Sequence, residues 1–120
     1  MIFMHIVDDY YLQGILASMK QKQWWLKQEN YKAKYKWDYL VALFMHAFSW
    51  AFCIMLPIAF KLSFNVNWCF YLSFTLNLAI HFAVDDLKAN KMKINLVEDQ
   101  LIHLTQIVVT FILYILGGFA

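Results

Sequence analysis

The sequence predicts an all-α protein, specifically an integral membrane four-helix bundle, from two observations. The chain of 120 residues is 62% hydrophobic and only 15% charged, with a mean hydropathy of +0.51, whereas soluble domains average about 25% charged residues. In addition, residues 39–60, 62–84 and 100–120 contain no Asp, Glu, Lys or Arg. Each run reaches the roughly 20 residues with which an α-helix crosses a bilayer. None of them alternates with the period of two that a membrane β-barrel requires.

The first predicted helix, residues 1–19, differs from the others because Asp8 and Asp9 lie in its middle. It has no basic leading region and no cleavage motif, so it does not resemble a signal peptide. We expect a fourth, partly polar helix that the others shield from lipid, either as a full span or as a short one. The remaining helices are expected at about 38–60, 64–86 and 97–117. Together they form one transmembrane domain over residues 1–120.

The lysines predict how the helices are oriented. Nine of the ten lysines fall within residues 20–36 and 88–93. With four helices arranged as two hairpins, both basic segments emerge on the same side, which the positive-inside rule assigns to the cytoplasm. The prediction is a multi-pass protein of the bacterial inner membrane, in contact with membrane lipids and able to form homo-oligomers. Aromatic residues among these lysines suit the headgroup region, so nucleic-acid binding is not predicted.

The four histidines fall one in each predicted helix and have acidic or polar neighbours at helical spacing. Residues three or four apart share a face of a helix, so four polar stripes are expected: His5 with Asp9 and Gln13, His46 with Ser49 and Cys53, His81 with Asp85 and Lys88, and Asp99 with His103 and Gln106. A carboxylate in the middle of a spanning helix costs about 2.5–3.5 kcal/mol on insertion scales. Such groups persist when they face the bundle interior and find partners there.

A divalent cation would neutralise several of these groups at once, and imidazole and carboxylate ligands suit Zn²⁺ or Mn²⁺. The expected ligands are His81, Asp85, Asp99 and His103, because a short loop joins their helices. The expected catalytic residues have three roles. Asp9 completes the ligand shell or acts as general base, and His5 and His46 orient or bridge the ligands. Lys88 or Lys20 holds a phosphate as a point charge. The alternative interpretation is a purely structural polar network, with Asp8 and Asp86 facing the headgroups.

Depth along the helices supports a common layer for three of the histidines. Counted from the cytoplasmic boundary at about 1.5 Å per residue, His46, His81 and His103 lie on the order of 7–12 Å into the bundle. Asp9 reaches this layer only if the first helix ends near Gln13 rather than at Lys20.

Several spaced motifs cover nearly the whole chain: H-x3-D-x3-Q at His5, Asp9 and Gln13; H-x3-D-x2-K at His81, Asp85 and Lys88; and D-Q-x2-H at Asp99, Gln100 and His103. In these motifs, and in His46, the chain resembles a family of small integral-membrane proteins of bacteria and phages that has no established activity. The resemblance implies a compact membrane bundle with a polar centre. The His/Asp helices are also similar, more loosely, to those of membrane-bound metal-dependent hydrolases.

Three functions fit these observations. The leading one is a membrane-embedded, metal-dependent hydrolase acting on a lipid or lipid-linked ester or phosphoester near the cytoplasmic leaflet. The second is a channel or transporter subunit for protons or metal ions, since intramembrane Asp/His chains also form relays. It requires polar stripes that continue to the outer face, where the last helix offers only Thr110 and Tyr114. The third is a structural or partner-binding membrane protein, for which the resemblance to bacterial and phage proteins allows a phage origin.

Overall fold

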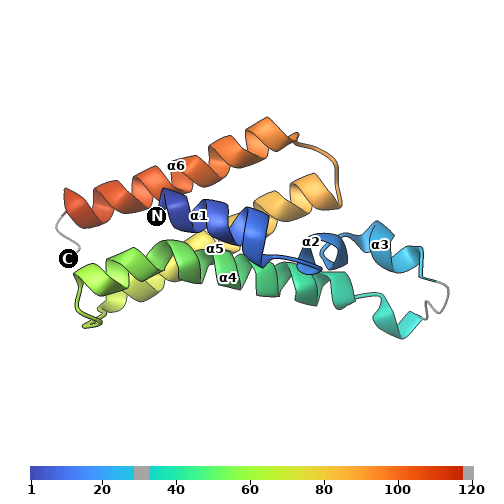
Figure 1. Ribbon diagram of the computed structural model, residues 1–120, viewed down its shortest axis with the longest axis horizontal. Helices are drawn as coiled ribbons and strands as arrows, with labels where there is room; N and C mark the ends of the chain where they lie inside the picture. Colours follow the sequence, from blue (N-terminus) through green and yellow to red (C-terminus); the bar gives the residue numbers. More distant parts are fainter. Residues whose placement is uncertain (29–32, 118–120) are drawn as a thin grey trace.

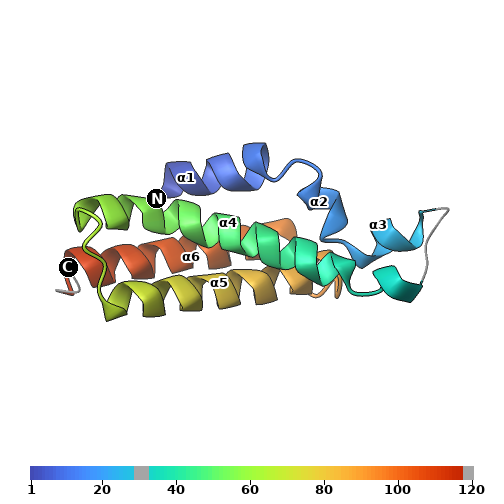
Figure 2. The same ribbon diagram turned by 90° about the horizontal axis from the view of Figure 1, so that it is seen from below.

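The computed structural model describes residues 1–28 and 33–117, and every regular element within them is helical. The all-α prediction is therefore confirmed over this part of the chain. Three long helices, α4 (Asp38–Lys61), α5 (Trp68–Ala89) and α6 (Leu96–Ile115), run up and down along the long axis (Figure 1). The N-terminal α1 (Ile2–Ile6) continues into a π-helix, η1 (Val7–Leu12), which packs along α4 (Figure 2). Short helices α2 (Leu16–Met19), α3 (Lys22–Leu26) and η2 (Ala33–Tyr35) lead to α4.

The starts of α5 and α6 are set by asparagine caps. The Asn67 side chain accepts a hydrogen bond from the Phe70 backbone N–H at 3.0 Å, so α5 begins at Trp68 and not at the predicted residue 64. Ser63 and the residue after it have φ values of 50° and 59° and form the preceding turn. At α6, Asn95 and Glu98 form a reciprocal capping box, which satisfies two backbone N–H groups that have no partner within the helix.

The first helix is short. It was predicted over residues 1–19, but the helical path from Ile2 ends at Leu12, and Gly14 adopts φ +47°, a conformation that favours glycine. Eleven residues extend about 16 Å, roughly half the thickness of a bilayer core. The structure thus has the short form of this helix, with the break at Gln13 and Gly14 that brings Asp9 to the depth of the histidines.

Polar and apolar side chains are distributed in the reverse of the usual soluble pattern. Buried polar residues fill the middle of the bundle, whereas large apolar side chains are exposed on all three long helices, including Phe44, Phe52, Leu76, Val108 and Phe111. A contiguous exposed apolar surface is characteristic of an interaction or membrane-facing surface. A smaller apolar core, built around Trp50, Ile54, Met55, Ile58, Ile107 and Tyr114, occupies the end of the bundle remote from the basic segments.

Two of the described helices, α4 and α6, are long and apolar enough to cross a membrane. Helix α5 has 22 residues but also carries Asn77, His81 and Asp85, which lower its hydropathy. The connection from η1 to α4 and the α5–α6 loop lie at the same end of the bundle (Figures 1 and 2). The two lysine-rich segments therefore share one end, with Lys32 outside the described residues.

Candidate metal centre

The polar centre of the bundle gathers side chains from every major helix. The exposed fraction is 0% for His81, Asp99 and His103 and 1% for His46. Helices α1 and η1 add His5 and two aspartates, and α5 adds Asp85, all of them buried. Within one water-excluded volume the structure brings together all four histidines and four carboxylates, listed in chain order as His5, Asp8, Asp9, His46, His81, Asp85, Asp99 and His103.

The π-helix explains why two consecutive aspartates both face inward. The backbone N–H of Gln13 bonds to the carbonyl of Asp8, five residues earlier, at 3.2 Å. The wider turn of a π-helix, which often marks functional sites, buries both Asp8 and Asp9. The expectation that Asp8 faces the headgroups is wrong: its Oδ1 accepts hydrogen bonds from Ser49 Oγ at 2.5 Å and from Cys53 Sγ at 3.8 Å. Asp86, in contrast, pairs with Lys91 at the surface.

Three possible ligand atoms surround Nε2 of His46. His81 Nε2 lies 3.1 Å away, Asp85 Oδ2 3.2 Å away and Asp9 Oδ1 3.5 Å away. A single imidazole N–H can be directed at only one of these atoms. A cation placed between them would instead accept electron pairs from all four groups, as imidazole and carboxylate ligands do around a divalent metal ion.

The surroundings of His103 repeat this arrangement. Its Nε2 lies 3.3 Å from Asp85 Oδ1 and 3.3 Å from Asp99 Oδ1. Bonds of about 2.0–2.1 Å between an ion and its ligands place neighbouring ligand atoms roughly 3.0–3.4 Å apart. The separations around His103 fall within this range, and those around His46, at 3.1–3.5 Å, fall within or close to it.

Two groups of side chains can hold a metal ion, because their ligand atoms lie within 4.8 Å of one another: Asp9, His46 and His81, and His81, Asp85 and His103. The second group contains three of the four ligands predicted from sequence. The fourth, Asp99, lies beside His103 but outside both groups. Asp9 was expected to complete the ligand shell or act as base, and His46 to orient or bridge the ligands. Both supply possible ligand atoms in the first group.

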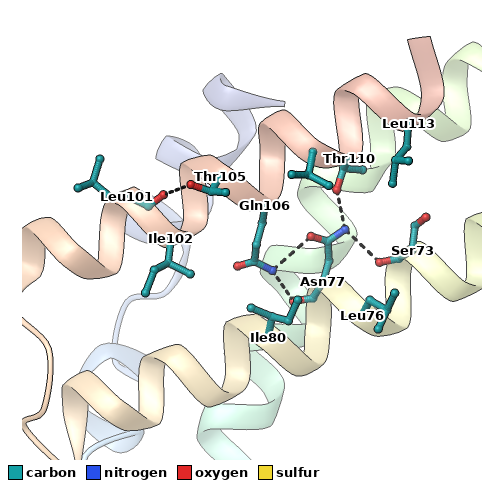
Figure 3. A pocket seen from close by; sticks show the side chains of 11 residues that line it. Ser73, Leu76, Asn77, Ile80, Leu101, Ile102, Thr105, Gln106, Thr110 and Leu113 are labelled. Atoms are coloured by element: carbon teal, nitrogen blue, oxygen red, sulfur yellow. Dashed lines mark hydrogen bonds between the residues drawn. The ribbon is translucent and has the colours of Figure 1, made fainter. Parts of the chain in front are cut away.

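Hydrogen bonds fix the ring of His103 in a ligating form. Its Nδ1 lies 3.3 Å from Gln106 Oε1, and the Gln106 amide in turn donates to the backbone carbonyl of Asn77 at 3.1 Å and to its side-chain oxygen (Figure 3). Because an amide oxygen only accepts, Nδ1 of His103 donates to it, and Nε2 is the nitrogen that faces Asp85 and Asp99 and could bind an ion there. Such outer contacts set the tautomer of histidine ligands in metal sites.

His5 is held in the opposite tautomer. Trp50 Nε1 donates to His5 Nδ1 at 2.7 Å, so the proton of the ring is on Nε2, which lies 3.1 Å from Gln100 Oε1. The Gln100 amide then donates to Asp99 at 3.0 Å and to Asp9 at 3.5 Å. His5 therefore positions the two carboxylates through Gln100, and its nitrogens are occupied.

Buried polar atoms without a hydrogen bond concentrate in this centre. Among the described residues they are, in the centre and at its rim, Asp8 Oδ2, Asp9 Oδ1, Gln13 Oε1, His46 Nδ1, His81 Nδ1 and Asp99 Oδ1. Leaving one such group unsatisfied costs about 1–3 kcal/mol, and more for a charged group. The carboxylate oxygens of Asp9 and Asp99 are the ones that a cation would satisfy.

Two lysines close the centre towards the basic end of the bundle. Lys20 Nζ lies 2.5 Å from Asp85 Oδ2, and Lys88 Nζ lies 2.6 Å from Asp99 Oδ2. Both lysines line a cavity of about 360 Å³ that also includes Gln13 and Asp85. Lys91 differs, because it pairs with Asp86 at the surface, and that carboxylate raises the pKa of the Lys91 ammonium group.

An apolar pocket of about 450 Å³ lies between α5 and α6 (Figure 3). Its polar members are bonded to one another: the Asn77 amide donates to the Ser73 carbonyl at 3.0 Å and to Thr110 Oγ1 at 2.9 Å. Sequence analysis did not single out Asn77 or Trp50. Both occur in apolar stretches without acidic neighbours, so only the three-dimensional packing shows that Trp50 bonds to His5 and that Asn77 bonds to Gln106, the partner of His103.

Comparison with protein-family models, with curated proteins and with solved structures finds no match to this chain. The chemistry of the centre is therefore interpreted from its own residues. Mixed imidazole and carboxylate donors, an enclosed volume and cationic side chains at one opening are the features from which a function is inferred.

Proposed function

We propose that this chain is a multi-pass protein of the bacterial inner membrane, a four-helix bundle whose lysine-rich segments face the cytoplasm. The exposed apolar side chains of α4, α5 and α6 and the buried polar centre support a lipid surrounding. The common end of the two basic segments supports the orientation (Figure 1). A reporter enzyme active only outside the cytoplasm should be active when fused after Gly117 and inactive when fused after Lys91.

Within the membrane we propose a metal-dependent hydrolase that acts on a phosphoester of a lipid or lipid-linked molecule. The observation that carries this proposal is the lysine-lined cavity of about 360 Å³ that borders Asp85. It joins a buried set of potential metal ligands to the basic end, where the headgroups of the cytoplasmic leaflet would lie. Lysines are common binders of phosphate, as point charges, which favours a phosphoester over a carboxylic ester.

The residues have distinct roles in this proposal. His81, Asp85, Asp99 and His103 hold the ion, Zn²⁺ or Mn²⁺, which when bound polarises the phosphoryl group and lowers the pKa of a water molecule. Lys20 and Lys88 bind the phosphate oxygens, and the carboxylates they release then face the ion. We assign Asp9 as the acceptor of the proton from the attacking water and as the donor of that proton to the leaving oxygen, because Asp9 lines a small polar cavity of about 70 Å³ with both lysines.

The contacts towards the other end of the bundle favour hydrolysis over transport. Beyond His103 the described buried polar side chains are those of Gln106, Asn77, Thr110, Ser73 and Tyr114, which form a chain of hydrogen bonds. None of these five side chains titrates near neutral pH or carries a charge there. The lysine-lined opening beside Asp85 suits a reaction centre that a substrate enters and leaves by the same side.

The test is hydrolysis by the full chain in mixed micelles. Protein stripped with a chelator and reloaded with Zn²⁺ or Mn²⁺ is supplied with phosphatidic acid, phosphatidylglycerol or diacylglycerol, and the release of phosphate, glycerol phosphate or fatty acid is measured. We expect metal-dependent cleavage of a phosphoester, lost in His81→Ala and Asp99→Ala. Thr105→Ala, on the exposed side of α6, is the matched control and should retain activity. Metal-loaded protein that cleaves none of the three lipids would refute the proposal.

A further inference from the structure

We propose that the centre binds two divalent ions, with Asp85 bridging them. This inference rests on the proposed function. In phosphoester hydrolysis a pair of ions stabilises both the attacking oxygen and the leaving oxygen. The sequence predicted one set of four ligands. The structure adds a second group, Asp9, His46 and His81, and Nε2 of His46 in this group also lies 3.2 Å from Oδ2 of Asp85.

The carboxylate of Asp85 points its two oxygens at different histidines. Its Oδ1 lies 3.3 Å from His103 Nε2 and 3.7 Å from His81 Nε2, whereas its Oδ2 lies 3.2 Å from His46 Nε2. A carboxylate that binds one ion on each oxygen adopts this arrangement. Two-metal centres place their ions about 3.5–4 Å apart, a spacing that one bridging carboxylate spans.

Each ion then has its own protein ligands. The first is held by His81, His103, Asp99 and Oδ1 of Asp85, and the second by His46, Oδ1 of Asp9 and Oδ2 of Asp85, which leaves Oδ2 of Asp9 as the proton acceptor. Asp9 Oδ1 is buried, lies 3.5 Å from His46 Nε2 and makes no hydrogen bond, so it is available as a ligand. Three protein ligands leave a position open for water or substrate, as in catalytic metal sites. His81 offers one Nε2 lone pair and therefore serves only one of the ions.

In this structure Lys20 Nζ lies 2.5 Å from Asp85 Oδ2, the oxygen assigned here to the second ion. The cavity beside it has a volume of about 360 Å³, which gives the ammonium group room to move onto a phosphate. Charge then balances: the carboxylates of Asp8, Asp9, Asp85 and Asp99 offset two divalent ions, and Lys20 with Lys88 offsets the phosphate. With one ion and both lysines released, two negative charges would stay uncompensated inside the bundle.

The test is the number of Mn²⁺ ions bound by the chelator-stripped full chain, measured by equilibrium dialysis with elemental analysis, together with the electron paramagnetic resonance spectrum. We expect two ions per chain and a spectrum of exchange-coupled Mn²⁺. His46→Ala should bind one ion with an uncoupled spectrum, whereas Met45→Ala, an exposed neighbour on α4, should retain two coupled ions.

One Mn²⁺ per wild-type chain, or two uncoupled ions, would overturn the inference, and neither result depends on whether a variant folds. Two ions that persist in His46→Ala would equally overturn the assignment of the second site. The outcome is separable from the proposed function. Two coupled ions without hydrolysis would refute only the hydrolase, and hydrolysis with a single ion would refute only the second site.

Discussion

His103 Nδ1 and Gln106 Oε1 lie 3.3 Å apart, one turn along α6. This contact makes Nδ1 of the buried ring a donor, and it leaves Nε2 directed at the carboxylates. Gln106 is itself fixed by Asn77 of α5. The orientation of one imidazole thus depends on a residue that never reaches the carboxylates.

Replacing Gln106 by Leu should weaken metal binding, because His103 loses the acceptor that selects its tautomer. Loss of such an outer contact typically costs 10–100-fold in metal affinity or activity. Competition with a metal-binding dye measures the affinity. Thr105→Ala on the adjacent position of α6 should bind as the wild type does, and equal affinity in Gln106→Leu would show that this contact does not orient the ligand.

Replacing Trp50 by Phe should allow both tautomers of the His5 ring to be populated. The phenyl ring retains a surface against His81, whose ring lies 4.2 Å from that of Trp50 in a stacked arrangement, but it cannot donate to His5 Nδ1. Nitrogen NMR of a histidine-labelled sample should report one tautomer of His5 in the wild type and a mixture in the variant. Trp24→Phe, in the connection before α4, provides the control. A single unchanged tautomer in Trp50→Phe would contradict the prediction.

Replacing Lys20 by Met should have opposite effects on metal binding and on turnover. Without the Lys20 ammonium group, a metal ion no longer competes with a positive charge for the Asp85 carboxylate. We therefore expect the metal affinity to rise on the order of tenfold, equivalent to about 1.4 kcal/mol. Hydrolysis of a phospholipid should fall, since one phosphate-binding charge is lost.

The same measurements on Lys91→Met provide the comparison, because Lys91 pairs with Asp86 at the surface. That variant should match the wild type in both affinity and turnover. If Lys20→Met binds metal more weakly than the wild type, Lys20 supports the ligand set and does not compete with the ion.

Replacing Gly14 by Val should destabilise the junction between η1 and α2. At φ +47° a β-branched residue is strained, and a left-handed conformation costs roughly 1–2 kcal/mol for residues with a side chain. Asn tolerates this conformation better, so Gly14→Asn should lose less stability. Thermal unfolding in detergent compares the two variants, and equal midpoints would mean that the positive φ is not required.

The periodic patterns of the sequence were enough to predict the helical class and which residues share a face. His81 with Asp85, and Asp99 with His103, lie together in the structure because residues four apart on a regular helix do so. The prediction of Asp8 failed for the same reason: the rule assumes 3.6 residues per turn, and η1 is a π-helix. No residue type in VDDYYL marks that local widening in advance.

Contacts between helices were not predictable from spacing. The pairing of Lys20 with Asp85 joins residues 65 positions apart, and it depends on the turn at Gly14, which redirects the chain after η1. Trp50 was indistinguishable from other aromatic residues of α4 until the packing placed its N–H against His5. Periodicity identifies a face of one helix, whereas the partner of that face depends on how all the helices are assembled.

The two lysine–carboxylate pairs have a consequence for biogenesis. In the proposed membrane location, a chain that enters the bilayer before it binds an ion carries Asp85 and Asp99 near the ends of two helices. Lys20 and Lys88 lie 2.5 and 2.6 Å from these carboxylates. The two ammonium groups therefore neutralise Asp85 and Asp99 while no ion is bound. Insertion can then precede cofactor delivery, and the two steps need not be coupled in the cell.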